Sequence, residues 1–146
     1  MENSNSSVEK PKKIKFDFKD SKYATGRRKR SIAKVWIKKG NGNIHVNGMK
    51  MNEYFKRPVH QIIVTRPLEI TQVSSNYDVK CSVKGGGLSG QAGAIILGIS
   101  KALIAHDENL KKNLKKDKLT TRDSRVVERK KYGHRKARRS FQFSKR

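Results

Sequence analysis

Two segments of the chain alternate between apolar and polar residues, with the two-residue period of a strand that buries one face. The apolar positions are Ala33, Val35 and Ile37 in residues 31–38, and Tyr77, Val79, Cys81 and Val83 in residues 77–84. Successive side chains of a strand point to opposite faces, so each segment predicts a strand with one face in a core. The alternation is clearest in residues 77–84.

A glycine-rich segment, residues 40–42 (GNG), separates the first of these strands from a shorter alternating run at residues 44–46. Asn-Gly between two alternating runs is a strong hairpin signal, because both residues tolerate positive φ. We therefore predict a hairpin between residues 31–38 and 44–46. A second Asn-Gly pair, Asn47 and Gly48, ends the shorter strand.

Residues 49–73 have a less regular pattern. Asn52 is suited to cap a short helical turn through Tyr54 and Phe55, and Pro58 is suited to start a second helix. The segment IIVT at residues 62–65 fits a helix or a strand equally well, and both interpretations stay open. Residues 68–73 predict a further short strand.

Apolar residues recur every three or four positions over residues 89–106, which predicts the main helix, with Ser89 as its N-cap. Residues 107–116 begin with acids and end with lysines, as suits the dipole of a second, solvent-facing helix. The apolar stripe of the main helix must cover a sheet. The predicted fold class is therefore α+β: a two-layer domain over residues 22–117, with a mixed sheet of about four strands and helices on one face.

Both ends of the chain lack this apolar periodicity. Residues 1–21 mix Asn, Ser and charges of both signs, and we expect a disordered leader. Transit peptides are rich in Arg and poor in acids, unlike this segment, so organelle import is the less favoured interpretation. Residues 118–146 contain 12 Lys and Arg against two acids. Such a segment cannot bury enough apolar surface to order itself, so we expect an extended basic C-terminal tail that is mobile without a partner.

The overall charge points to a polyanionic partner. The chain of 146 residues has a formal net charge of +24, from 36 basic and 12 acidic residues. RNA, DNA and anionic membrane are the abundant candidates. Membrane is the weakest, because no stretch approaches the roughly 20 consecutive apolar residues of a spanning helix and no secretory signal starts the chain.

Residues 85–90 (GGGLSG) match the G-x-G-x-x-G pattern between a strand and a helix. A dinucleotide site would need a further parallel strand with an acid at its end, yet Asp107 and Glu108 lie beyond the main helix and only a basic tail follows. A phosphate-binding Walker loop fails as well, because Gln91 and Ala92 stand where Lys and Ser or Thr are required. The glycines then serve a tight turn whose exposed backbone amides can meet an RNA phosphate.

No enzymatic site emerges from the sequence. The histidines, His45, His60, His106 and His134, fall on separate elements without ligands at metal-binding spacing. Cys81 is the single cysteine, which excludes an internal disulfide, and its alternation places it in the core. We predict that the protein is not an enzyme and needs no cofactor and no metal.

Two features favour RNA over other polyanions. Residues 27–30 are four adjacent cations at the entrance to the first predicted strand, and no acid between Ser21 and Asn52 can pair with them. In the tail, Tyr132, Phe141 and Phe143 are interleaved with arginines. Cations that neutralise phosphates beside rings that stack on bases suit irregular RNA better than duplex DNA. A chromatin-like DNA-binding protein remains the alternative.

Several motifs together resemble the bacterial type of the ninth protein of the small ribosomal subunit. They are TGRRK at residues 25–29, GNG at 40–42, YF at 54–55, RPLE at 66–69, VKGGGLSGQAGAI at 83–95 and the tail at 121–146, which ends in QFSKR. The resemblance spans residues 22–146. His134 and Phe141 stand where the family pattern has Leu and Pro, and residues 1–21 have no counterpart.

The resemblance implies a domain like the second domain of the fifth small-subunit protein, with a left-handed β-α-β crossover where general handedness rules predict a right-handed one. It further implies a structural role in the subunit head, on the 3′ domain of small-subunit rRNA, among neighbouring head proteins. The tail would reach the anticodon stem-loop of peptidyl-site tRNA. The bacterial cytoplasm is the expected location.

These considerations give a set of candidate RNA-binding residues. In the domain, those expected at rRNA are Arg27, Arg28, Lys29, Arg30, Gly85, Gly86, Gly87, Ser89 and Gln91. In the tail, they are Arg122, Arg125, Arg129, Lys130, Lys131, Arg135, Lys136, Arg138 and Arg139. By resemblance, the residues expected at tRNA are Ser144, Lys145 and Arg146.

Overall fold

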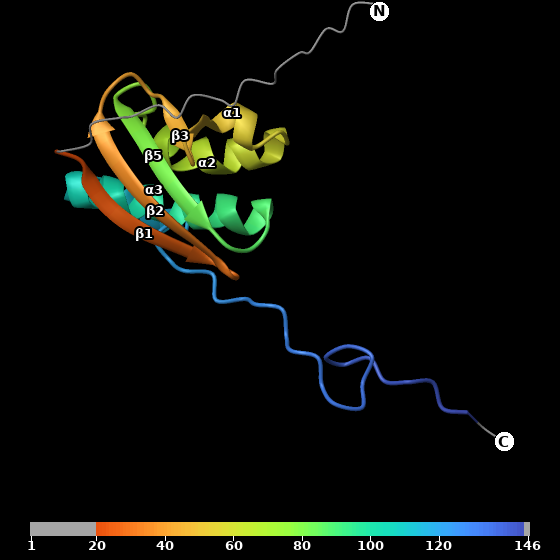
Figure 1. The fold of residues 1–146 in the computed structure, drawn as a ribbon. Coiled ribbons are helices and arrows are strands. Elements are labelled where there is room, and N and C mark those ends of the chain that lie inside the picture. The colour runs from red at the N-terminus through yellow and green to blue at the C-terminus, as the bar shows by residue number, and fades with distance from the viewer. Residues whose placement is uncertain (1–19, 145–146) are drawn as a thin grey trace, which may run out of the picture.

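A computed structural model describes residues 20–144, and the expectation of a disordered leader falls almost wholly outside them. Five strands form one sheet, and the helices pack on one of its faces (Figure 1). The strands are β1 (Lys22–Arg28), β2 (Ser31–Lys39), β3 (Ile44–Val46), β4 (Met49–Lys50) and β5 (Tyr77–Lys84). The helices are α1 (Met51–Tyr54), α2 (Pro58–Ile70), α3 (Leu88–His106) and α4 (Lys111–Lys116), with a 3-10 turn at Glu108–Leu110. The predicted two-layer α+β class is confirmed, with five strands in place of about four.

The two alternating segments form the strands that were predicted from them. β2 and β5 pair in antiparallel register, with Val35 opposite Cys81. Their inward residues are buried and join the apolar face of α3 in a single core, which includes Ile95, Ile99 and Leu103. The alternation of the sequence therefore reports the two strands at the centre of the fold.

The predicted hairpin between residues 31–38 and 44–46 is wrong. The strand order is β1-β2-β5-β3-β4, so β5 lies between β2 and β3. Residues 40–43 bend over the start of β5, where the N–H groups of Asn41 and Asn43 donate to Oδ1 of Asp78 at 3.0 and 2.8 Å. β5 buries every second side chain, and pairing both of its edges leaves no apolar edge strand exposed. The pairing of β5 with strands on both of its edges outweighs the local Asn-Gly hairpin signal.

The hairpin partner of β2 is instead β1, which the sequence pattern did not reveal. Arg27 and Arg28 belong to this strand, and the turn follows at Lys29, whose φ is 51°. β1 has little apolar content because it lies close to the backbone of α3: a Cβ at Gly26 would overlap the carbonyl oxygen of Ala94. Small residues thus take the place of the apolar stripe on which strand prediction depends.

Asn47 and Gly48 form a tight turn between β3 and β4. Their φ values are 52° and 85°, as a type I′ hairpin requires. The prediction that these residues end the shorter strand is confirmed, whereas the hairpin that they form with β4 was not predicted.

Two helices, separated by residues 55–57, follow β4. α1 and the start of α2 at Pro58 agree with prediction, and residues 62–65 are helix. The cap at Asn52 is wrong, because Lys50 is the N-cap of α1 and no side chain caps it. The strand predicted at residues 68–73 is also wrong: α2 continues through Pro67 to Ile70. Pro67 and Leu68 are buried in the helical layer, and this packing outweighs the hydrogen bond that proline cannot donate.

α3 is the central helix and buries most of its 19 residues. Its N-cap is Gly87, so the cap predicted at Ser89 is wrong by two residues. By length and composition α3 is the one described helix that is apolar enough to cross a membrane, but 61% of its apolar window is buried inside the domain. A core helix passes the same test, and the burial identifies α3 as one.

The segment after α3 departs in part from the predicted solvent-facing helix. The side chain of Asp107 accepts from the N–H of Asn109 at 3.0 Å and so caps the 3-10 turn. In α4 the lysines are exposed, whereas Leu114 is fully buried. This helix is thereby fixed to the core by one side chain.

β3 and β5 run parallel, and the chain between them passes through β4, α1 and α2. This connectivity is a β-α-β crossover, and its left-handed sense stays an expectation from the family resemblance. After α4 the chain leaves the domain and extends away from it (Figure 1). The domain and the basic tail are thus separate in shape.

Candidate RNA interface

The β1–β2 turn and the glycine loop, residues 85–87, lie against each other. The hydroxyl of Ser31 donates to the carbonyl oxygen of Gly85 at 3.0 Å. A Cβ at Gly85 would lie 2.6 Å from the carbonyl oxygen of Arg30, and Gly85 has a φ of 73°. Two candidate clusters that are more than 50 residues apart in sequence therefore share one corner of the domain.

The glycine loop presents backbone rather than side chains. Gly86 has a φ of 62°, and nothing lies within 4 Å of a Cβ built at Gly87. Gly87 starts α3, and no side chain caps the first turn of this helix. The N–H groups of a helical first turn have no intrahelical acceptor, and the dipole of the helix favours an anion there. This corner can accept a phosphate oxygen beside Lys29 and Arg30, which are both exposed.

Gln91 and Ser89 differ in their surroundings. The side chain of Gln91 donates to the carbonyl oxygen of Gly85 at 3.2 Å, and its own oxygen accepts from the hydroxyl of Tyr54 at 2.8 Å. Gln91 thus holds the glycine loop in place. Ser89 is exposed in the first turn of α3 and faces solvent. The supporting roles of Tyr54 and Ser31 carry no sequence signal of their own, because both depend on contacts across the fold.

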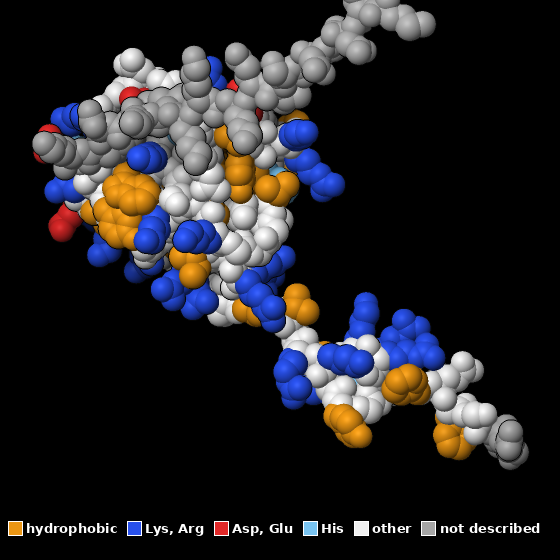
Figure 2. All heavy atoms as spheres, viewed as in Figure 1, with side chains coloured by type: hydrophobic (Ala, Val, Ile, Leu, Met, Phe, Trp, Pro, Cys, Tyr) orange, Lys and Arg blue, Asp and Glu red, His pale blue; other side chains and the backbone are white. Residues whose placement is uncertain are grey.

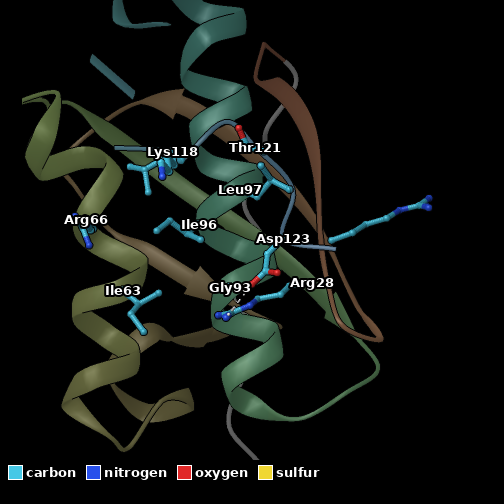
Figure 3. Close-up of a pocket in the computed structure, with 11 residues that line it drawn as sticks. Arg28, Ile63, Arg66, Gly93, Ile96, Leu97, Lys118, Thr121 and Asp123 are labelled. Atoms are coloured by element: carbon cyan, nitrogen blue, oxygen red, sulfur yellow. Dashed lines mark ion pairs between the residues drawn. The ribbon is translucent and has the colours of Figure 1, made fainter. Parts of the chain in front are cut away.

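Arg28 does not project freely with its cationic neighbours. Its guanidinium pairs with Asp123 at 3.2 Å, and its side chain lies along the helix at Gly93, where a Cβ would overlap it (Figure 3). Asp123 also accepts two hydrogen bonds from Arg125, at 3.0 and 2.9 Å. The acid that balances Arg28 therefore comes from the tail, nearly 100 positions away in the sequence.

Asp123 is strongly stabilised in its charged form. Hydrogen bonds from the side chain and backbone of Arg125, together with the charges of Arg125 and Arg28, hold the pKa of the Asp123 carboxyl well below its usual range. The same pairing raises the pKa of Arg125. Arg28 and Arg125, both candidates for rRNA contact, are thus engaged with one carboxylate at the root of the tail.

The root of the tail lies beside a cleft between α2 and α3. This cleft, of about 250 Å³, is lined in part by Ile63, Ile96 and Lys118, and Asp123 lies at its side (Figure 3). Leu119 packs against the core. These contacts fix the point at which the tail leaves the domain.

The next part of the tail passes the corner described above. Residues 126–130 and the corner residues Lys29, Arg30, Gly86 and Gly87 together line a hollow of about 490 Å³. Arg129 and Lys130 are exposed at this hollow. The structure therefore brings the cationic turn, the glycine loop and the tail cations Arg129 and Lys130 to a single surface.

Further along, the tail is an exposed and strongly basic segment without helix or strand (Figure 2). Glu128 pairs with Arg138 at 3.0 Å and with Lys131 at 3.5 Å, which closes a loop in the tail. The remaining cations project into solvent without an acid at ion-pair distance in the described part of the chain: Arg122, Arg129, Lys130, Arg135, Lys136 and Arg139. Ser144 is exposed, and Lys145 and Arg146 lie outside the described residues.

Three aromatic rings of the tail have no apolar environment. Tyr132, Phe141 and Phe143 are exposed, Phe143 at 86%. The guanidinium of Arg135 lies 5.3 Å from the centre of the Phe141 ring. Exposed rings beside cations suit stacking on unpaired bases.

Burial shifts the pKa of two titratable groups of the core. It raises the pKa of the Cys81 thiol, so this thiol stays protonated, and it lowers the pKa of His45. Tyr77 and His106 share a hydrogen bond of 3.2 Å between the hydroxyl and Nδ1. Within residues 20–144, no three potential metal ligands come together.

A comparison with known protein families gives a match over most of the chain. Residues 26–146 match the family model described as Ribosomal protein S9/S16. The matched segment starts inside β1 and includes the glycine loop, α3 and the entire tail. It leaves the leader outside.

Proposed function

This chain belongs to the ribosomal protein S9 family, and from that premise we propose that its domain binds the 3′ head domain of small-subunit rRNA while its tail reaches peptidyl-site tRNA. Proteins of this family belong to the small ribosomal subunit and bind rRNA, and they are structural rather than enzymatic. The chain therefore works in the ribosome, with rRNA and ribosomal proteins as its partners. Its proposed setting is the bacterial cytoplasm.

One observation supports the proposal more than any other: the family match continues through the tail to residue 146. A tail that served only solubility would need positive charge and no defined sequence. This tail instead has a matched sequence, exposed cations and three exposed rings. Its length also suits a distant target, since 20 extended residues span about 65 Å.

The geometry suggests how the two parts divide the work. The corner formed by Lys29, Arg30 and the glycine loop offers fixed charges and backbone N–H groups, which position a phosphate backbone without reading its sequence. The pairing of Asp123 with Arg28 and Arg125 sets the direction in which the tail departs. The domain thus supplies a rigid anchor, and the tail folds along RNA from that anchor.

The tail becomes ordered only when RNA supplies the missing contacts. Its described cations are mostly exposed, and few of its hydrogen bonds reach back to the domain. Phosphates neutralise the arginines, and unpaired bases provide surfaces for Tyr132, Phe141 and Phe143. Residues at the very end would then touch the tRNA anticodon stem-loop by charge.

The tRNA contact is tested by deleting Lys145 and Arg146. Small subunits that contain the truncated protein should assemble normally yet release peptidyl-site tRNA severalfold faster in a filter-binding assay, because two charge contacts to the anticodon stem-loop are lost.

A variant with Lys111→Gln and Lys112→Gln serves as the control, since it removes two exposed lysines of α4 that are not among the candidate RNA-binding residues. It should retain tRNA like the unaltered subunit. Equal tRNA retention by truncated and intact subunits would overturn the tRNA contact and leave rRNA binding standing.

A further inference from the structure

Among the residues that the structure describes, no helix covers one face of the sheet. The helices pack on the other face, and the sheet lies toward the viewer in Figure 1. β1, β2 and β5 are adjacent and in register, so their outward side chains form rows across this open face. The outward residues are Tyr23, Thr25 and Arg27 on β1, Ile32, Lys34, Trp36 and Lys38 on β2, and Asp78, Lys80, Ser82 and Lys84 on β5.

This open face combines apolar and cationic side chains. Tyr23 is 49% exposed and Ile32 is 44% exposed, so apolar surface lies beside the cations of this face. Five outward residues are basic and one, Asp78, is acidic. That acid already accepts two hydrogen bonds from the 41–43 loop. Hydrophobic and basic side chains are visibly mixed on this side of the domain (Figure 2).

An aromatic pair forms the centre of one row. The rings of Tyr23 and Trp36 have centroids 5.3 Å apart and an interplanar angle of 41°. On the other side of Trp36, Nζ of Lys80 lies 6.0 Å from the ring centre. The indole is thus flanked by a ring and a cation and stays partly exposed, as a surface for stacking requires.

A hollow adjoins the aromatic pair. It has a volume of about 330 Å³ and is lined by Ile32, Lys34, Trp36, Ser82 and Lys84. Its lining thus combines two apolar side chains, Ile32 and Trp36, with two lysines. Apolar contact for a planar ring and cations for a phosphate are therefore available within one site.

The open face continues into the RNA-binding corner. Ile32 and Lys84 are paired in register, and each lies within two positions of that corner, Ile32 after Arg30 and Lys84 before Gly86. A polynucleotide bound at the glycine loop can extend along the sheet without leaving the protein surface.

Charge and composition distinguish the possible occupants. Lysine is depleted at the centres of protein–protein interfaces, yet here Lys34 and Lys84 line the hollow itself. In a duplex the bases are stacked within the helix and offer no free ring faces. An unpaired strand offers both phosphates and free bases, which match the lysines and the rings.

We propose that the open face of β1, β2 and β5 binds an unpaired segment of rRNA, with a base stacked on Trp36 and phosphates at Lys34 and Lys84. This inference rests on the proposed function, because it adds a second contact surface to the same rRNA-binding protein. It assigns a role to aromatic residues that neither the core nor the tail uses.

The first test uses Trp36 as its own reporter, because it is the single tryptophan of the chain. Titration of the full-length protein with single-stranded oligoadenylate should quench its fluorescence, whereas inorganic polyphosphate, which has the charge and no bases, should leave it nearly unchanged. Equal responses to the two polyanions, or no response to oligoadenylate, would overturn the proposal.

The second test compares variants by their affinity for the 3′-domain rRNA. Trp36→Ala should bind about tenfold more weakly, within the range found for the loss of one stacked base, and Trp36→Phe should recover most of that loss. Ile62→Ala, which removes an exposed apolar side chain from α2, is the control and should bind normally. Circular dichroism checks that each variant is folded. If Trp36→Ala does not fold, the quenching test still decides the proposal, because it uses the unaltered chain.

The outcomes separate this inference from the proposed function. If a Lys29→Gln, Arg30→Gln variant loses rRNA affinity and Trp36→Ala does not, the open-face proposal fails and rRNA binding stands. If Trp36→Ala keeps its rRNA affinity but subunits built with it lose a neighbouring head protein, the face binds protein and the proposal is overturned. If the unaltered chain does not bind the 3′-domain rRNA, the proposed function itself fails.

Discussion

At the scale of single residues, Asp123 is the acid on which the arrangement of the interface depends. It pairs with Arg28 of β1 and with Arg125 of the tail, so it connects the folded domain to the segment that leaves it. An exposed ion pair alone contributes little to stability. Here three charged groups and a backbone hydrogen bond act together at the root of the tail.

Replacing Asp123 with Asn should free the root of the tail, because Arg28 and Arg125 lose their shared carboxylate. Trypsin should then cleave after Arg125 severalfold faster, while urea unfolding of the domain changes little. Asp117→Asn is the matched control, since the ion pair of Asp117 with Arg66 is long, at 3.9 Å. Equal cleavage of the two variants would contradict the role of Asp123.

The same ion pairs have a defined pH dependence. The pKa of Asp123 is lowered in the folded chain, so its contribution is fully present above the unfolded value of about 3.9 and is lost as the pH falls through the lower folded value. In a titration, the amide NMR signal of Arg125 should hold its position from neutral pH to about pH 4 and move only in stronger acid. Movement centred near pH 4 would show that the pairing is absent.

Residues with a local signature could be identified from the sequence, whereas residues defined by distant contacts could not. The alternation of residues 77–84 gave β5 with its buried face, and the glycine loop gave the turn into α3. Arg28 was grouped with its cationic neighbours, because nothing near it in sequence reveals Asp123. Gln91 was expected at rRNA, and its contacts with Gly85 and Tyr54 show a positioning role inside the protein.

At the scale of elements, the packing of β1 on α3 sets the geometry of the cationic turn. Gly26 of the strand meets Ala94 and Gly98 of the helix almost backbone to backbone. Such close approach needs small residues, and it explains why β1 has no apolar stripe. The turn at Lys29 is consequently held at a fixed distance from the first turn of α3.

Gly26→Ala should destabilise the domain by about 3 kcal/mol, the upper end of the range for overpacking, because the new methyl group would overlap the backbone of α3. The free energy of unfolding in urea measures this. Gly87→Ala is the control, with nothing within 4 Å of its Cβ, and should cost less than about 1 kcal/mol. Similar losses for the two variants would contradict the close strand–helix contact.

Element types were predicted better than element partners. β2, β5 and α3 follow from their apolar periods, and the end of β3 follows from Asn47 and Gly48. The predicted pairing of β2 with residues 44–46 was wrong, because β5, a strand more than 30 residues away, occupies that edge of β2. A local turn signal cannot weigh that competition, and neither can it foresee that α2 continues through Pro67.

At the scale of the whole molecule, the chain consists of a packed domain and a solvated tail. The domain buries nearly all of the strongly periodic apolar residues, and the tail has 12 of the 36 basic residues in its 29 positions. Charge explains the attraction to RNA, and the interleaved rings favour unpaired RNA. The family match adds the identity of that RNA, which charge and rings alone do not supply.

The most direct test of rRNA binding through this tail is its salt dependence. If about half of the 12 tail cations meet phosphates, the tail contributes a slope of about −4 to a plot of log affinity against log salt concentration. The intact chain and a chain that ends at Thr120 should be titrated with 3′-domain rRNA over a range of salt concentrations. The account predicts that the intact chain has the steeper slope by about that amount, and equal slopes for the two chains would contradict it.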